Sequence, residues 1–223
     1  MSDIALNISL LKQQIPPSVK IVAVSKTRPV DEIVALYNTG HRIFGENRVQ
    51  ELLAKKDKLP SDIEWHLIGH LQSNKVRSVV PFISMIESVD SARLLRVINE
   101  EAEKKGRVVD CLLQFHIAQE ETKSGFNEEE VFTLIGSGEL ARFGYVRICG
   151  MMGMATFTER KDQVRLEFRF LKSLFDTLKA KYFSDNRNFR EISMGMSGDF
   201  KLAVEEGSTM IRIGTLIFGN ARR

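Results

Sequence analysis

Lys26 is the residue of this sequence best suited to covalent chemistry. It follows residues 21–24 (IVAV), a short apolar run typical of a buried strand, and so stands near the end of that strand. A lysine held against apolar walls loses solvation of its charged form, so its pKa falls and its neutral amine can condense with an aldehyde. The alternative is an ordinary strand-end lysine that reaches solvent or pairs with Glu46.

Two turns of small residues, 194–199 (MGMSGD) and 212–215 (RIGT), have the composition of a phosphate site. Glycines such as Gly214 let the backbone approach a ligand closely, and the hydroxyls of Ser197 and Thr215 can donate to phosphate oxygens together with N–H groups at a helix start. The alternative is that Ser197 is an ordinary helix N-cap and Gly214 a tight turn. A reactive lysine beside a phosphate site indicates pyridoxal 5′-phosphate (PLP), or a phosphosugar in a lysine-dependent aldolase.

Arg212 bears on the choice between these ligands. A guanidinium beside a pyridine nitrogen keeps that nitrogen unprotonated, because a second positive charge next to a permanent one is unfavourable. This weakens the ring as an electron sink. An arginine at a strand end can equally bind a substrate carboxylate, and the sequence leaves both roles open.

The histidines and methionines give weaker signals. His66 and His70 have i,i+4 spacing, but Gly69 intervenes and a strand end does not place them on one helical face. We therefore expect no metal site, and expect His66 to line a pocket. The methionines within residues 151–154 are typical of core filler.

Composition excludes several classes of protein. The chain has 223 residues, with 32 Lys+Arg against 29 Asp+Glu, and no basic stripe interleaved with aromatic residues, so we expect no nucleic-acid partner. No apolar run reaches the ~18 residues of a membrane helix, and the first residues lack a signal-peptide pattern. Cys111 and Cys149 lie in apolar runs, as buried reduced thiols do. We expect a cytoplasmic protein without a membrane contact.

Apolar runs and longer segments with helical periodicity alternate along the chain, which is the pattern of alternating strands and helices. The expected strands are 20–25, 42–46, 64–69, 85–89, 108–117, 146–151, 191–194 and 210–214, and the expected helices include 30–38, 48–56, 92–105, 128–135, 161–181 and 200–206.

This count predicts a single (β/α)8 TIM barrel over residues 1–223, with an extra N-terminal helix within the first fifteen residues. The rival, an open doubly wound sheet, would place a glycine-rich turn after the first strand, where this chain has residues 25–29 (SKTRP). Barrel active sites lie at the C-terminal strand ends, where the candidate side chains fall. Residues 120–126 after the fifth strand are expected to form a loop over that mouth.

Two helix starts show capping-box spacing. Asn47 precedes Gln50 by three residues, and Asn127 precedes Glu130 by three. In this arrangement the first side chain accepts from an unpaired N–H group and the second reaches back to the first residue. We expect helices to begin after both asparagines.

With these residues in view, the chain closely resembles the pyridoxal phosphate homeostasis proteins, a family related in fold to the N-terminal barrel of alanine racemase. The resemblance spans nearly the whole chain, and its motifs occur in the family's order. One departure from the family's pattern is the segment 150–157 (GMMGMATF), which is richer in methionine. The motifs are 23–27 (AVSKT), 44–51 (FGENRVQE), 65–75 (WHLIGHLQSNK), 121–126 (ETKSGF), 193–199 (SMGMSGD) and 207–219 (GSTMIRIGTLIFG).

The resemblance implies a covalent internal aldimine between PLP and Lys26. By the same likeness Ser197, Gly214 and Thr215 help to hold the phosphate, Arg212 lies by the pyridine nitrogen, and Asn47 lies near the ring substituents. His66 and Met196 complete the expected cofactor-binding set. No residue is assigned a catalytic role.

The resemblance also implies storage or delivery of PLP without established turnover. We expect a monomer that meets apo PLP-dependent enzymes transiently. One alternative is a small fold-type III PLP enzyme, an amino-acid racemase or lyase with His66 or a nearby residue as its base. Racemisation needs groups on both faces of the substrate, and one barrel of this length leaves no chain for the second domain that supplies one in racemases. The other alternative is the cofactor-free aldolase.

Overall fold

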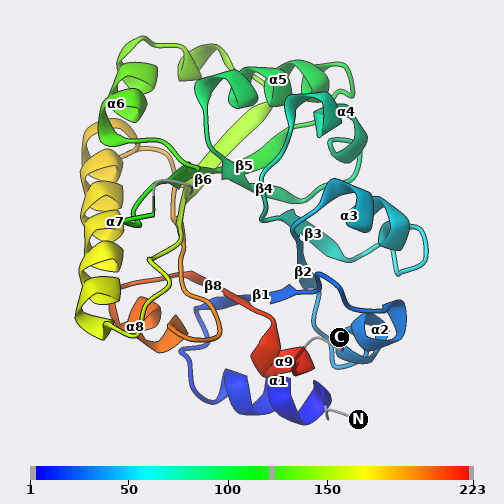
Figure 1. Ribbon diagram of the computed structural model, residues 1–223. Helices are drawn as coiled ribbons and strands as arrows, with labels where there is room; N and C mark the ends of the chain where they lie inside the picture. Colours follow the sequence, from blue (N-terminus) through cyan, green and yellow to red (C-terminus); the bar gives the residue numbers. More distant parts are fainter. Residues whose placement is uncertain (1–3, 121–123, 221–223) are drawn as a thin grey trace.

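Eight parallel strands close into a barrel in sequence order, with the helices around its outside (Figure 1). The computed structural model describes residues 4–120 and 124–220. The predicted (β/α)8 barrel is confirmed. Seven of the expected segments contain an observed strand, and the expected strand 146–151 ends two residues before the observed one. The strands are β1 (Lys20–Val24), β2 (Ile43–Glu46), β3 (Glu64–Leu67), β4 (Met85–Val89), β5 (Val109–Phe115), β6 (Val146–Gly153), β7 (Glu191–Ser193) and β8 (Met210–Ile213).

Apart from the first helix, which precedes β1, the helices follow the strands, and the shortest of them were not predicted. Four-residue α4 and α9 are too short to show helical periodicity, as are the two 3-10 turns, Ser73–Lys75 and Leu140–Arg142. The helices are α1 (Ile4–Lys12), α2 (Val30–Tyr37), α3 (Val49–Lys56), α4 (Val76–Val79), α5 (Ala92–Glu103), α6 (Glu128–Gly136), α7 (Lys161–Tyr182), α8 (Phe200–Glu205) and α9 (Thr215–Phe218).

Alternation along β1 divides the core into two layers. Ile21 and Ala23 belong to the large apolar cluster that the helices cover, whereas Val22 and Val24 belong to a second cluster. Because successive strand side chains point to opposite faces, the second cluster fills the interior of the barrel. The interior is therefore packed, and ligand chemistry is confined to its ends.

The expected N-terminal helix is present as α1. Ile4, Ile8 and Leu11 are buried on one side of it. Helix α1 lies beside α9 (Figure 1), and the side chain of Asn7 donates to the carbonyl of Ile217 at 2.9 Å. This contact joins the first helix to the segment that follows β8, and so supports the end of the strand that carries Arg212.

A bulge in β6 requires glycine. The pairing of β5 with β6 shifts between Cys111 and Leu112, and Gly150 has a φ of 149°. A Cβ atom at Gly150 would collide with the carbonyl oxygen of Glu191 on β7. Glycine thus lets β6 bend without losing its neighbour, which keeps the mouth ends of both strands in the barrel.

One of the two expected capping boxes forms. Asn127 accepts from the N–H of Glu130, and the Glu130 carboxylate accepts from the N–H of Asn127, both at 2.9 Å. The prediction for Asn47 is wrong. Helix α3 begins at Val49, and the residue at its N-cap position is Arg48, whose side chain makes no capping hydrogen bond. The Glu46 carbonyl still accepts from the N–H of Ile68, just after the end of β3, so Glu46 belongs to the barrel. Residues 47 and 48 therefore connect the barrel to the start of α3.

We expect Asn127→Ala to lower the free energy of unfolding by about 1 kcal/mol, because the N–H of Glu130 loses its acceptor. Asn47→Ala is the matched control, since its side chain caps no helix and should leave stability unchanged. Urea denaturation of both variants without ligand measures the difference. Equal losses for the two substitutions would contradict the assignment of the caps.

Candidate ligand site at the mouth of the barrel

A cavity of about 320 Å³ opens among the C-terminal ends of β1, β6, β7 and β8. It is the place where a TIM barrel carries its chemistry. Six of the eight predicted site residues line it together. The lining comprises Val24, Lys26, Ala155, Thr156, Phe157, Thr158, Val164, Met196, Ser197, Gly198, Asp199, Arg212, Gly214 and Thr215.

Lys26 lies at this mouth as an exposed side chain. The expected burial against apolar walls is wrong, because the chain turns outward directly after β1 and carries Lys26 to the rim. Within the described residues its amine has no hydrogen bond or ion pair. The alternative pairing with Glu46 is not formed either, because Glu46 is fully buried and binds the Ser25 hydroxyl at 2.6 Å and the Lys55 ammonium at 2.7 Å.

The backbone on both sides of Lys26 is held by one cluster. The Lys55 ammonium donates to the carbonyl of Ser25 at 2.8 Å and to the carboxylate of Glu51 at 2.6 Å. The same Glu51 oxygen accepts from the N–H of Thr27 at 2.5 Å. Thr27 has a φ of 63°, a left-handed conformation that a threonine adopts only when its surroundings impose it. The cluster therefore fixes the direction in which Lys26 leaves the barrel.

Burial dominates the electrostatics of Glu46 in this cluster. It raises the pKa of the carboxyl above its ordinary value, although the hydrogen bonds from Lys55 and Ser25 and the charge of Lys55 work against that rise. Oε2 of Glu46 has no hydrogen-bond partner among the described residues. A carboxylate in this position depends on Lys55 for most of its stabilisation.

A second part of the cavity wall, formed by the residues that follow β7 and β8, presents free hydrogen-bond donors. In the described part of the chain, the N–H groups of Ser197 and Gly198 have no acceptor, and the hydroxyls of Ser197 and Thr215 have no partner. The turn is held in shape by Asp199, which accepts from the N–H of Met196 at 2.5 Å. The N-cap of α8 is Asp199, so Ser197 is not the ordinary cap that we considered as an alternative.

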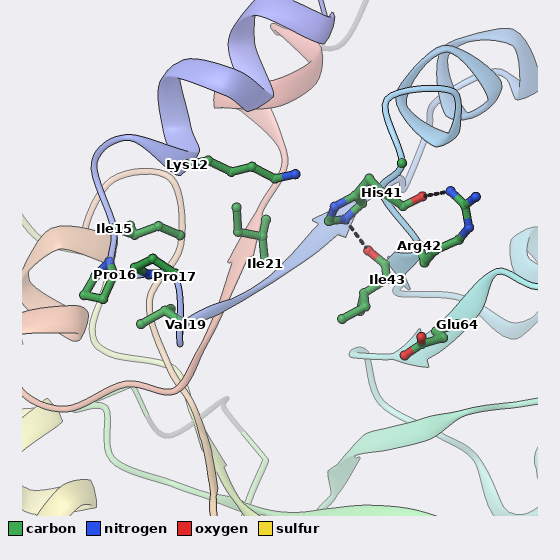
Figure 2. A pocket seen from close by; sticks show the side chains of 11 residues that line it. Lys12, Ile15, Pro16, Pro17, Val19, Ile21, His41, Arg42, Ile43 and Glu64 are labelled. Atoms are coloured by element: carbon green, nitrogen blue, oxygen red, sulfur yellow. Dashed lines mark hydrogen bonds between the residues drawn. The ribbon is translucent and has the colours of Figure 1, made fainter.

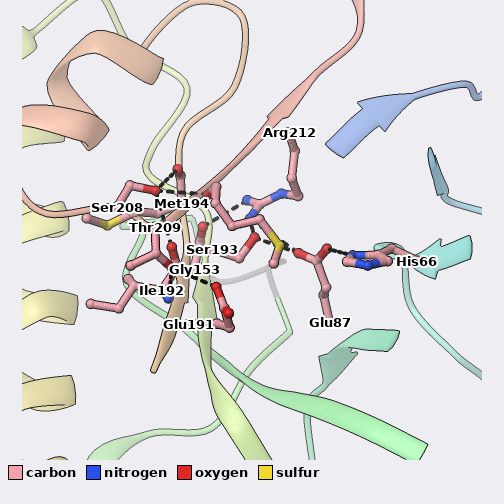
Figure 3. A network of polar contacts seen from close by, with 11 residues as sticks. His66, Glu87, Gly153, Glu191, Ile192, Ser193, Met194, Ser208, Thr209 and Arg212 are labelled. Atoms are coloured by element: carbon pink, nitrogen blue, oxygen red, sulfur yellow. Dashed lines mark hydrogen bonds and ion pairs between the residues drawn. The ribbon is translucent and has the colours of Figure 1, made fainter. Parts of the chain in front are cut away.

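A row of buried polar side chains lies behind this wall and crosses the barrel from β8 to β3 (Figure 3). Arg212 donates to the hydroxyl of Ser193 at 2.6 Å and to the carbonyl of Gly153 at 3.0 Å. Ser193 in turn donates to Glu87 at 2.5 Å, and Nδ1 of His66 lies 2.7 Å from the other oxygen of Glu87. Arg212 is thereby anchored with its guanidinium at the cavity floor.

The charged residues of the row change one another's pKa values. Burial lowers the pKa of Arg212, and the attraction of Glu87 and Asp199 opposes that change. Burial alone would raise the pKa of Glu87, but the hydrogen bond and charge of His66, together with Arg212 and Ser193, hold it below its ordinary value. Glu87 is thus an anion inside the barrel.

The two remaining predicted site residues lie outside the cavity lining. His66 is buried and turned toward Glu87, so the expectation that it lines the pocket is wrong: a buried carboxylate on the neighbouring strand binds its ring. Asn47 is half-buried beyond the end of β2. His70 is exposed, and its Nδ1 lies 2.9 Å from Asp90.

Sequence reasoning missed Glu87. It is the one charged residue of β4, whose five residues are all buried. A carboxylate in such a strand needs a cation or several donors, and this requirement is a signal that could have found it. Of the expected mouth loop, residues 121–123 lie outside the described residues, while Phe126 is buried and its N–H donates to the carbonyl of Gln114 at 2.8 Å.

A second cavity, of about 460 Å³, lies at the opposite end of the barrel (Figure 2). The ammonium of Lys12 points toward the ring of His41 there, and Nε2 of His41 bonds the carbonyl of Ile43 at 2.8 Å. Nε of Arg42 donates to the carboxylate of Asp62 at 2.8 Å. This end carries the N-terminal strand ends, and none of the predicted site residues lies there.

The lowered pKa of His41 leads us to expect a loss of stability in acid. Burial, with the charges of Lys12 and Arg42, lowers its pKa from 6.5 to about 4. The unfolded chain therefore binds more protons between these values, so stability falls as the pH falls through this window, by up to about 3 kcal/mol. Urea denaturation from pH 7 to pH 4 should show a shallower decline for His41→Phe than for the wild type. The exposed His70→Gln is the control, and an unchanged decline in His41→Phe would contradict the prediction.

No helix among the described residues is long and apolar enough to cross a membrane. Both cysteines are free and buried, and burial raises the pKa of Cys149 to about 12.

Comparison with known proteins identifies the family of this chain. Residues 1–222 match the family model described as alanine racemase, N-terminal domain. The pyridoxal phosphate homeostasis protein of Aquifex aeolicus is 40% identical over 205 residues, which cover 91% of this chain and 87% of that protein.

Solved structures agree as well. PipY of Synechococcus elongatus without PLP superposes with a TM-score of 0.91 at 37% identity, over 97% of this chain and 100% of PipY. The structure of PipY with PLP bound gives a TM-score of 0.87 at 36% identity, over the same shares of the two chains. The chain therefore belongs to the alanine racemase N-terminal domain family and, within it, to the pyridoxal phosphate homeostasis proteins.

Proposed function

We propose that this chain binds PLP in the mouth cavity, as a Schiff base on Lys26, and stores or delivers it without turning over a substrate. The observation that carries the proposal is that an unpartnered lysine and free hydrogen-bond donors line the same cavity. The PLP-bound structure of PipY, which has 36% identity to this chain, supports it.

The residues present fit the cofactor. The free N–H groups of Ser197 and Gly198 and the hydroxyl of Thr215 suit a phosphate, which needs several donors converging on its oxygens. Gly214 leaves room for close approach, because a Cβ there would meet its nearest neighbour atom only at 3.4 Å. Arg212 on the cavity floor would face the ring nitrogen and keep it unprotonated.

Lys26 has the chemistry that covalent attachment requires. When bound, PLP supplies an aldehyde, whose carbon forms a double bond to the amine nitrogen while its oxygen leaves as water. No carboxylate of the described residues competes for the Lys26 amine, and the cluster around Lys55 holds the backbone on either side of it. The lysine is exposed, so exchange with cofactor from outside needs no opening of the core.

The cavity's polar groups favour holding the cofactor over using it. His66, the base named for the alternative racemase or lyase together with unspecified nearby residues, is bound to Glu87 and lies outside the cavity lining. Asp199, which does line the cavity, is engaged with the N–H of Met196. As parts of the same proposal, residues 1–223 act as one domain, as a cytoplasmic monomer, and apo PLP-dependent enzymes receive the cofactor in brief encounters.

Absorption spectroscopy of the purified protein tests binding. After addition of PLP and removal of the excess, we expect a visible band that borohydride abolishes, and a pyridoxyl phosphate adduct on the Lys26 peptide by mass spectrometry. A protein that shows no band after reconstitution would refute the proposal. A sugar-phosphate adduct on Lys26 would favour the aldolase, and turnover of any amino acid beyond that given by free PLP would favour the racemase or lyase.

Delivery can be separated from simple release by a dialysis membrane that passes PLP but not protein. The loaded protein and an apo PLP-dependent enzyme are placed either together or on opposite sides. Direct transfer predicts faster activation of the enzyme when the proteins are mixed. Equal rates in the two arrangements would contradict a direct encounter. Sedimentation of the loaded protein tests the monomer.

A further inference from the structure

The polar row behind the cavity contains one residue in contact with the mouth and one anion buried behind it. Arg212, Ser193, Glu87 and His66 are each no more than 4% exposed. Of these four, Arg212 alone lines the cavity. The shortest separation between its guanidinium and the carboxylate of Glu87 is 3.9 Å. The charge of Glu87 therefore acts on the cavity through Arg212.

The hydrogen bonds of the row have fixed directions. A carboxylate only accepts, so the hydroxyl proton of Ser193 points to Glu87 and leaves the Ser193 oxygen to accept from Arg212. For the same reason Nδ1 of His66 carries the proton that faces the other oxygen of Glu87. Both oxygens of Glu87 are thereby held, and the carboxylate cannot rotate away from Arg212 without breaking one of these bonds.

We propose that Glu87 is a positioning residue for Arg212, which holds the guanidinium at the cavity floor and offsets part of its positive charge. The inference rests on the proposed function, since it concerns the field that Arg212 exerts on a bound cofactor. An uncompensated guanidinium would make the cavity more positive and would disfavour a proton on the Schiff-base nitrogen at Lys26. Glu87 thus favours the proton on the Schiff-base nitrogen without contacting the cofactor.

Few other charges face the site in the described part of the chain. Lys26 and Asp199 line the cavity with Arg212, and Glu87 and His66 lie behind Arg212. Glu191 offers a matched control, because it is also buried but pairs with Lys20 at 2.6 Å at the other end of the barrel. A substitution there changes a buried carboxylate without changing the field at the mouth.

A pH titration of the visible band in the reconstituted protein tests the inference. Glu87→Gln removes the negative charge and keeps the shape, so we expect the titration midpoint to fall by about one pH unit. Glu87→Asp restores the charge and should titrate close to the wild type. Glu191→Gln should titrate like the wild type even where it lowers the melting temperature, which separates charge at the site from general loss of stability.

Coincident titrations of Glu87→Gln and the wild type would overturn the inference, as would an equal shift in Glu191→Gln. If Glu87→Gln does not fold, Ser193→Ala takes its place, because it keeps both charges and removes the hydroxyl that links them. Its midpoint should then depart from that of the wild type, and coincidence would overturn the inference. Failure of the wild type to develop any band would instead refute the proposed function, so the two failures are distinguishable.

Discussion

Lys26→Ala is expected to abolish the visible band and the borohydride-stable adduct completely. The described residues include no other lysine in the lining of the mouth cavity, so no neighbouring amine can replace it. Lys26→Arg should behave in the same way despite its positive charge, because a guanidinium remains protonated and does not condense with an aldehyde. Absorption spectra and intact mass after reduction measure both variants.

The same substitution should leave the fold intact. Lys26 is exposed and makes no hydrogen bond or ion pair with the described residues, and such surface changes usually alter stability by no more than about 0.5 kcal/mol. Lys12→Ala, at the opposite end of the barrel, is the matched control and should retain the band. A band that survives in Lys26→Ala would move the covalent site elsewhere, and a band lost in Lys12→Ala would show that the assay reports general damage.

The barrel was predictable because its signals are local. Each strand is a short apolar run, and a closed parallel sheet brings the ends of all its strands to one rim. This is why Lys26, Ser197 and Thr215, which are far apart in sequence, could be placed in one site before the structure was known. Their expected meeting in one cavity follows from topology alone.

The interior of the site was not predictable in the same way. Whether His66 faces a cavity or a carboxylate depends on Glu87 of the next strand, and whether Lys26 pairs with Glu46 depends on competition from Lys55 in the following helix. These outcomes depend on which buried charged groups pair with one another in the folded chain. Local patterns do not encode that choice, so the sequence reveals the rim of this site more readily than the polar groups that support it.

Lys55→Met is expected to lower the free energy of unfolding by about 3 to 5 kcal/mol, because it leaves a buried carboxylate without its cation. Lys55 has a side chain that is 9% exposed, and Glu46 is fully buried. Lys58→Met, three residues along, is the control, since that lysine is exposed. Urea denaturation at pH 7 measures both, and a loss in Lys55→Met no larger than in Lys58→Met would contradict the prediction.

A double substitution separates the charge of this cluster from its shape. Glu46→Gln in the Lys55→Met background removes the stranded carboxylate, so we expect much of the lost stability to return. The carbonyl of Ser25 still lacks its donor in that protein, and Glu51 can turn away from Thr27 because Lys55 no longer holds it. Attachment of PLP to Lys26 should therefore stay slower than in the wild type. Recovery of stability without recovery of the attachment rate would distinguish a cluster that directs Lys26 from one that only stabilises the barrel.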